Sequence, residues 1–424
     1  MSQEGGLKGR FSDLFTFGTG CGPEVLFCLR SGGGAPDFAQ QAFSTNANAT
    51  ARELSLFLQG AITLGVATVP VPSAGSGETF RLSPLGIPIR NEEESLGPIF
   101  AERALTLGKG SYLLGANVTV LQFQDLRGTS LEDLRFNVVQ RDLPPLGPPL
   151  GDPAIERTYL AVSTRMAFEA RVANLFFTGG VSDRLDLGIL VPFVQASLSG
   201  YSDAEIVLGE GDDPAAGFSF GGPTEDPKLT ERAVVARERA TGLGDVSVRG
   251  KLRLSEPEDR WGLAVLADLR LPTGRDRDFL GSPGAWIQGM GIVTLDSGGG
   301  FTPHLNGGFA LRRGEGQRNA LLLSVGFDHL ASSRLTLAGE LIGQSPLGSN
   351  PLRREVATIR SGTGVEASIP NSNLPSLRDD LLDGALGVKV KVWKAVALAN
   401  LIVPLNDGGL RSESLLTLGL QAGF

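Results

Sequence analysis

Residues 413–424, ESLLTLGLQAGF, alternate between apolar side chains and polar or small ones. One face of this segment carries Leu416, Leu418, Leu420, Ala422 and Phe424, and the other carries Thr417, Gly419, Gln421 and Gly423. Alternation with a period of two predicts a β-strand with an apolar environment on one side and a polar environment on the other. The segment therefore indicates a sheet that separates two environments.

The same alternation recurs back to about residue 110. It predicts twelve antiparallel strands, near residues 110–125, 156–178, 184–198, 243–254, 260–272, 284–295, 300–312, 319–328, 333–346, 382–391, 395–405 and 413–424. Strands of soluble folds usually have about five or six residues, whereas a tilted strand that crosses a bilayer needs about nine to eleven. Because strand edges cannot stay unpaired in lipid, such strands must close into a barrel. We expect an all-β fold, a transmembrane antiparallel β-barrel.

The connections between these strands alternate in length. Long ones are predicted near residues 126–155, 199–242, 273–283, 313–318, 347–381 and 406–412, and short ones near 179–183, 255–259, 296–299, 329–332 and 392–394. An even strand number with all short turns at one end is typical of bacterial outer-membrane barrels, whose short turns face the periplasm. A hairpin that includes Leu134–Val139 would raise the count to fourteen.

Composition excludes several function classes. The mean hydropathy of +0.05 is too polar for a bundle of transmembrane helices, and 58 glycines and 25 prolines favour turns and short connections. A net charge of −8 without a basic cluster argues against a nucleic-acid partner. Only two cysteines and two histidines are present, so we expect no metal site, and no motif indicates a cofactor.

Residues 1–109 differ from the rest and are predicted to form a partly helical plug or periplasmic segment ahead of the barrel at 110–424. A helix near 50–69 ends at Pro70 and Pro72. Arg52, Glu53 and Gln59 interrupt its apolar run, so we expect a buried or interfacial helix and not a membrane span. An ordinary core helix of a small globular domain has the same periodicity and stays an alternative.

Cys21 and Cys28 stand close together in CGPEVLFC. Their spacing is consistent with a local disulfide, which persists in an oxidising compartment such as the periplasm. Two unpaired thiols are the alternative. The opening MSQEGGLKGR lacks the charged and apolar regions of an export signal, so we expect a signal that was removed or a gene start that is misplaced.

If the apolar faces meet lipid, the charged residues of the opposite faces line the lumen. The candidate lumen-lining residues are Arg249, Lys251, Arg253, Asp268, Arg270, Arg312, Glu340, Lys389 and Lys391. Facing hydrocarbon at mid-depth would cost about 2–4 kcal/mol for each Arg or Lys. The basic members either attract anionic solutes or form an ordinary polar wall that neighbouring carboxylates neutralise.

Four passages resemble the outer-membrane family named for the MetA pathway of phenol degradation, whose members are distant relatives of the long-chain fatty-acid channels. These passages are LFTFGTG, GPIFAERALTLGKGSYLLGANVTV, TGLGDVSVRGKLRL and ADLRLPTGRDRDFLGSPG. The resemblance covers roughly residues 97–424 and implies passive uptake of small hydrophobic or aromatic solutes. It also implies that terminal Phe424 is read by the barrel-assembly machinery, and that lipid and lipopolysaccharide surround the barrel.

A structural or adhesive barrel that acts through its long outer loops is the alternative function. An enzyme is not expected, because His304 and His329 do not stand beside a nucleophile motif such as G-x-S-x-G. A soluble β-sandwich also alternates and is the third alternative.

Overall fold

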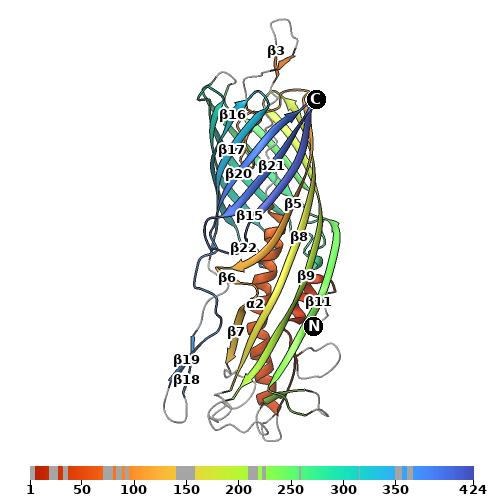
Figure 1. The fold of residues 1–424 in the computed structure, drawn as a ribbon, viewed down its shortest axis with the longest axis vertical. Coiled ribbons are helices and arrows are strands. Elements are labelled where there is room, and N and C mark those ends of the chain that lie inside the picture. The colour runs from red at the N-terminus through yellow and green to blue at the C-terminus, as the bar shows by residue number, and fades with distance from the viewer. Residues whose placement is uncertain are drawn as a thin grey trace.

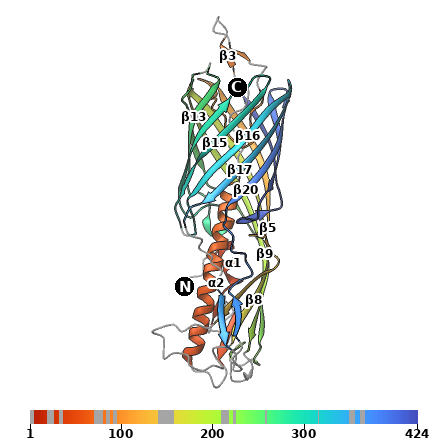
Figure 2. The same cartoon turned by 90° about the vertical axis from the view of Figure 1, so that its left-hand side faces the viewer.

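Twelve long strands of the computed structural model close into one antiparallel barrel (Figures 1 and 2). The structure describes residues 5–18, 27–31, 37–69, 80–82, 88–90, 95–139, 158–208, 218–221, 226–256, 259–314, 316–348, 356–360 and 366–424. In barrel order the strands are β5 (Tyr112–Leu126), β8 (Tyr159–Ser182), β9 (Leu185–Val207), β12 (Ser247–Arg253), β13 (Trp261–Arg270), β14 (Trp286–Leu295), β15 (Phe301–Arg312), β16 (Ala320–Ser332), β17 (Leu335–Pro346), β20 (Leu381–Val392), β21 (Ala395–Pro404) and β23 (Leu415–Gly423).

The last strand closes the barrel against the first. β23 pairs with β5 in a register that sets Leu416 opposite Val120. Beyond it, Tyr112 and Phe424 exchange backbone hydrogen bonds of 2.8 and 2.9 Å. Every strand of the ring therefore has a partner on both sides, as a bilayer requires.

The outer face of the ring is a continuous apolar belt. Its exposed members include Leu187, Ile189, Val248, Leu252, Leu263, Val265, Leu305, Phe309, Leu323, Val325, Leu337, Leu341, Leu386, Val390, Leu401, Leu416, Leu418 and Leu420. Their polar neighbours in sequence, such as Thr417 and Gln421, are buried inside. So extensive an exposed apolar surface exceeds what a soluble protein tolerates and matches the lipid-facing band of an outer-membrane barrel. The predicted outer-membrane β-barrel is confirmed.

All five predicted short turns lie at the end of the barrel that also holds the C-terminus (Figure 1). We call it the short-turn end and the other the long-loop end. At the long-loop end β8 and β9 continue far beyond the ring and pair with β7 (Leu134–Val139) and β11 (Thr230–Leu243) in a curved sheet. Among the described strands β7 pairs with the extension of β8 alone, apart from an isolated bridge from Phe136 to Ser372, so the ring keeps twelve strands and not fourteen.

The prediction of an outer loop at residues 199–242 is therefore partly wrong, because β9 continues to Val207 and β11 starts at Thr230. These segments lie beyond the apolar belt, and their outward faces carry Arg232, Arg237 and Glu205 in place of leucines. These segments therefore lack the alternation of apolar outward and polar inward side chains from which the membrane strands were predicted. Their inner faces still bury small and apolar side chains such as Ala233.

The helices α1 (Leu7–Asp13) and α2 (Asp37–Ala67) fill the inner side of this extension. Leu54, Leu58, Ile62 and Val66 follow each other at intervals of four residues and are buried in one cluster with side chains of β5, β7, β8 and β9. α2 begins at Asp37 and not near residue 50, because residues 37–49 contain neither Gly nor Pro to stop a helix. Among the described residues no helix is both long and apolar enough to span a bilayer.

Short strands complete the described fold. β1 (Phe17–Gly18), β2 (Phe27–Ser31) and β10 (Phe218–Phe220) form a small sheet beside α2, and η1 (Asp276–Asp278) contacts α1. β6 (Thr129–Ser130) and β22 (Leu410–Ser412) pair with β5, whereas β3 (Phe80–Leu82) with β4 (Pro88–Arg90) and β18 (Val356–Arg360) with β19 (Glu366–Pro370) form separate hairpins. Cys28 is buried on β2, but Cys21 lies outside the described residues, so the predicted disulfide stays a prediction.

The belt makes a prediction about stability. Val325 faces outward in the middle of β16, between Leu305 and Leu341 of the neighbouring strands. We expect Val325→Arg to lower the free energy of unfolding in lipid vesicles, measured by denaturant titration, by about 2–4 kcal/mol. Ser333→Arg, in the exposed turn after β16, is the control and should change it by no more than about 0.5 kcal/mol. Equal effects of the two substitutions would contradict a lipid-facing belt.

Candidate functional site

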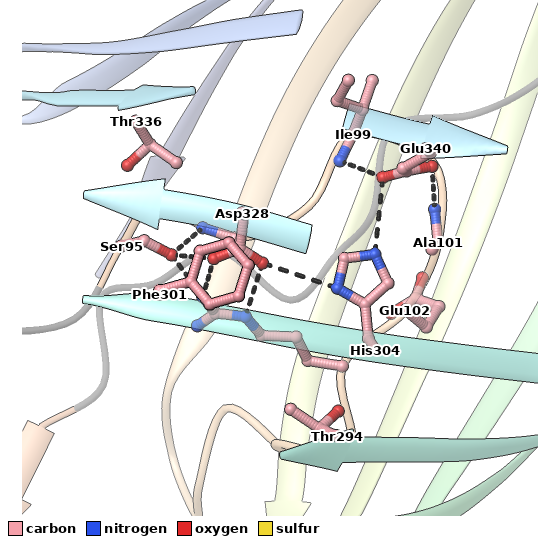
Figure 3. A network of polar contacts seen from close by, with 12 residues as sticks. Ser95, Ile99, Ala101, Glu102, Thr294, Phe301, His304, Asp328, Thr336 and Glu340 are labelled. Atoms are coloured by element: carbon pink, nitrogen blue, oxygen red, sulfur yellow. Dashed lines mark hydrogen bonds and ion pairs between the residues drawn. The ribbon is translucent and has the colours of Figure 1, made fainter. Parts of the chain in front are cut away.

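A non-helical segment, residues 95–110, lies inside the barrel towards the short-turn end. We call it the inner segment. It has almost no regular secondary structure, so its backbone groups need partners from the barrel wall. Figure 3 shows how side chains of several strands supply them.

Glu340 of β17 holds the centre of the inner segment. Its carboxylate accepts backbone hydrogen bonds from Ile99 at 2.7 Å, from Phe100 at 3.1 and 3.2 Å, and from Ala101 at 2.9 Å. Figure 3 shows the bonds from Ile99 and Ala101. Hydrogen bonds to a buried carboxylate are charge-assisted and stronger than neutral ones. One wall residue thus fixes three successive peptide groups.

A buried ion pair holds the same segment from the side. The Nε of Arg103 donates to Oδ1 of Asp328 on β16 at 3.0 Å, while its Nη2 and the hydroxyl of Ser95 contact the other carboxylate oxygen. Both charged side chains are almost completely inaccessible to solvent. Removing one partner would leave the other charge buried and unpaired, which is costly.

The remaining anchors are polar wall residues. Thr336 accepts a hydrogen bond from the backbone of Leu96 at 2.8 Å, and Lys389 donates to the carbonyl of Leu96 at 3.2 Å. Asn306 bonds both backbone groups of Glu102, at 2.7 and 2.9 Å. Thr294 accepts from Ala104 at 3.0 Å, and Asp186 accepts from Leu107 at 3.0 and 3.1 Å.

The side chain of Glu102 forms the third charged contact. Its carboxylate lies 3.0 Å from Arg249 and 3.2 Å from Lys251, both on β12. Arg249 also reaches Asp268 of β13 at 3.1 Å. The inner segment is therefore tied to strands on several sides of the lumen.

The nine candidate lumen residues lie on the inner side of their strands, but they do different things. Four hold the inner segment, namely Arg249, Lys251, Glu340 and Lys389. Asp268, Arg270 and Arg312 border a cavity described below. Arg253 donates to the carbonyl of Glu256 near a short turn, at 2.9 Å, and Lys391 is half-buried near another short turn.

The candidate set lacked the partners that the inner segment itself supplies, Glu102 and Arg103. A signal was available, because these two charges interrupt the otherwise apolar stretch PIFAERALTL. The histidine considered for catalysis, His304, is buried between Asp328 and Glu340, at 3.7 and 3.9 Å. His304 is thus one of the barrel-wall side chains beside the residues that hold the inner segment (Figure 3).

At the long-loop end α2 contacts residues at the mouth of the barrel. Arg127, in the turn after β5, forms a buried ion pair of 2.7 Å with Asp379, which Arg318 also contacts at 2.6 Å. The Arg127 guanidinium lies over the ring of Phe57 of α2, 5.0 Å from its centroid. Gly60 of α2 approaches Gly316 of the outer loop so closely that an added Cβ would lie 2.8 Å from a carbonyl oxygen. The helix therefore packs closely against the long-loop end of the barrel.

A cavity of about 180 Å³ lies in the lumen between the end of α2 and the inner segment. Thr68 and Val69, just after α2, and Phe100 and Ala101 of the inner segment line it from opposite sides. The wall contributes Arg249, Asp268, Arg270, Trp286, Gln288, Met290, Arg312, Leu322, Leu323, Ser324, Ile342, Gly343 and Gln344. We call it the lumen cavity.

Residues 164–344, which include most of the cavity wall, match a protein family described as "Putative MetA-pathway of phenol degradation". This is the family that the four passages of the sequence resemble. A search of curated proteins finds no match.

Among solved structures, this chain is similar to an outer-membrane channel from Pseudomonas putida F1, with 13% identity, a TM-score of 0.42, and coverage of 76% of this chain and 98% of that one. It is also similar to a Pseudomonas aeruginosa FadL homologue, with 11% identity, a TM-score of 0.33, and coverage of 74% and 90%. The corresponding values for the Pseudomonas putida toluene transporter TodX are 10%, 0.27, 84% and 99%.

The anchoring by Glu340 can be tested. In Glu340→Gln the side chain keeps its size but loses its charge and one acceptor oxygen, so we expect the inner segment to loosen. Because a hydrogen bond to a charged group contributes about 1.5–3 kcal/mol, the fraction of time that single channels conduct should rise about tenfold or more.

The matched control replaces a pair of inner-wall residues that do not touch the inner segment. Thr119 and Thr417 share a hydrogen bond of 2.7 Å, and the double substitution Thr119→Val with Thr417→Val removes both partners. It should leave conduction unchanged. An unaltered conducting fraction in Glu340→Gln would contradict the anchoring role.

Proposed function

We propose that the protein is a passive outer-membrane channel for small hydrophobic or aromatic solutes, and that its N-terminal residues 1–109 act as a plug with two parts. The observation that carries the proposal is the lumen cavity, which lies inside the lipid-belted barrel and is lined by residues next to the end of α2 and by the inner segment. A solute would pass from the long-loop end, past α2, through the cavity and past the inner segment.

The solute class has two supports. Phenol degradation, in the description of the matching family, points to aromatic compounds. The cavity wall includes the inward side chains of Met290, Leu322 and Ile342, although barrel interiors are ordinarily polar. Apolar side chains on a lumen face favour a solute with an apolar body.

Passage requires movement of the inner segment and not of the barrel. The segment is held by side-chain contacts, which exchange individually, whereas the barrel is held by continuous backbone ladders. Opening therefore means exchanging the wall contacts of residues 95–110 for water or solute contacts. An adhesive barrel, the alternative, would need no such movement.

A cross-link distinguishes the two functions. An ideal Cβ on Gly262 of β13 would lie 3.0 Å from the Cβ of Ala104, close to the span of about 3.5–4.5 Å that a disulfide needs. We expect Ala104→Cys with Gly262→Cys, once oxidised, to lower phenol flux into proteoliposomes at least about tenfold, because the inner segment is then fixed to the wall. Reduction should restore the flux.

The controls for this experiment are the parent chain and the single variant Ala104→Cys, taken through the same oxidation and reduction. They account for any effect on Cys21 and Cys28. Undiminished flux through the oxidised double variant would refute gating by the inner segment. Absence of flux in the parent chain would favour the adhesive function.

We further propose that lipopolysaccharide contacts the outward face of β8, β9 and β11 just beyond the belt. The last apolar row on these strands is Ala173, Phe193 and Leu243. The following rows carry Arg171 and Arg239, with Arg165 and Arg237 nearby, against one carboxylate, Glu169, which pairs with Arg237 at 3.0 Å. Arginines at this height suit the phosphates of outer-leaflet lipid.

The triple variant Arg165→Gln, Arg171→Gln and Arg239→Gln should bind lipopolysaccharide about a hundredfold more weakly, since each basic residue near an anionic membrane surface contributes about 1 kcal/mol and about 1.4 kcal/mol corresponds to a factor of ten. The control replaces three arginines at the short-turn end, Arg184, Arg260 and Arg334, in the same way. Equal loss in both triple variants, measured as lipid phosphate retained per protein, would show only a general charge effect.

We also propose that Phe424, exposed at the end of β23, is the signal that the barrel-assembly machinery reads.

A further inference from the structure

We infer that the lumen cavity is a binding site for an aromatic carboxylate, with the carboxylate on Arg270 and Arg312 and the ring against the apolar wall. The inference rests on the proposed function, because it assumes that solutes enter the lumen. It goes further by assigning a charge to the solute and by naming the residues that select it.

Three residues of the cavity form one row across neighbouring strands. The register sets Arg270 of β13 opposite Trp286 of β14, and Trp286 opposite Arg312 of β15. Both guanidinium groups lie over the indole ring, at 4.7 and 5.4 Å from its centroid. Both cations are therefore held against the same aromatic ring.

These two arginines lack the ion pairs that other lumen cations form, and the carboxylates nearest to Arg270 are those of Asp268 and Asp245. Arg270 donates to the carbonyl of Ala67, and Arg312 donates to the carbonyl of Arg318 at 3.1 Å and to the amide oxygen of Gln344 at 3.0 Å. Within the described part of the chain neither forms an ion pair, and the Nε of each has no hydrogen-bond partner. Lys251, in contrast, is paired with Glu102.

The charge of the cavity wall is consequently unbalanced. Arg249, Arg270 and Arg312 line it against a single carboxylate, Asp268, which Arg249 already engages at 3.1 Å. Arg270 and Arg312 are both more than nine-tenths buried. Buried cations without anionic partners are costly, so an anion in the cavity would bind favourably.

The shape of the anion follows from the rest of the wall. Guanidinium groups match the planar, two-oxygen geometry of a carboxylate. Phe100, Met290, Leu322 and Ile342 offer an apolar surface in the same cavity. Its volume of about 180 Å³ is below the range of about 300–1,000 Å³ typical of pockets for drug-sized ligands, which favours a single-ring compound.

The test uses the indole of Trp286 as the reporter. The chain has three tryptophans, and Trp261 and Trp393 are exposed, so Trp261→Phe with Trp393→Phe leaves one buried indole in the cavity. Titration with benzoate should quench its fluorescence and saturate. Benzamide, which has the same shape without the charge, should bind at least about tenfold more weakly, a difference that corresponds to about 1.4 kcal/mol.

Variants locate the site. Arg312→Gln and Arg270→Gln in the same background should each remove the preference for benzoate over benzamide, whereas Arg312→Lys should retain part of it. Arg253→Gln is the control, because Arg253 is an inward arginine that does not line the cavity. Migration of the folded barrel on unheated gels confirms that each variant is assembled.

The outcomes separate the inference from the proposed function. Equal affinity for benzoate and benzamide, or a preference that survives in both glutamine variants, would overturn the carboxylate site even if phenol flux is normal. Saturable benzoate binding in a chain that passes no solute would refute the channel and leave the binding site standing.

Discussion

The structure depends on one constraint, that no backbone N–H or C=O group can stay unpaired in hydrocarbon. The pairing of β23 with β5 satisfies it by closing the ring, and the leucines on the outer face then meet lipid. Closure also determines the interior. Because the lumen is enclosed, any chain that enters it must find its hydrogen bonds on the wall, and Glu340, Asp328 and Asn306 supply them to the inner segment.

The barrel was predictable because its rule is local. In β15 and β21, apolar and polar residues alternate and so indicate the two faces of the strand. The predicted ranges 300–312 and 395–405 differ from the observed strands by at most one residue at either end. The extension of β9 and β11 was missed because its outer face meets water, so the belt pattern stops at Phe193 and Leu243 although the strands continue. Periodicity reports the environment of a strand and not only its existence.

The candidate site was predictable as a list of inward charges but not as a set of contacts. Arg103 and Asp328 are 225 residues apart, and no spacing in the sequence indicates that they meet. Lys389 and Arg312 look equivalent as inward cations on barrel strands. Only the structure shows that the first holds the backbone of Leu96 while the second lies beside Trp286 without a carboxylate.

The position of the N-terminal residues has a consequence for biogenesis. Val69 and Phe100 line the same cavity from opposite sides, so α2 lies towards one mouth of the barrel while the inner segment lies towards the other. The polypeptide is thus threaded through the ring that its own later strands build. A finished ring would have to admit a helix as long as α2 through a narrow passage. We therefore expect the pairing between Tyr112 and Phe424, which closes the ring, to form last, after the N-terminal residues have entered the lumen.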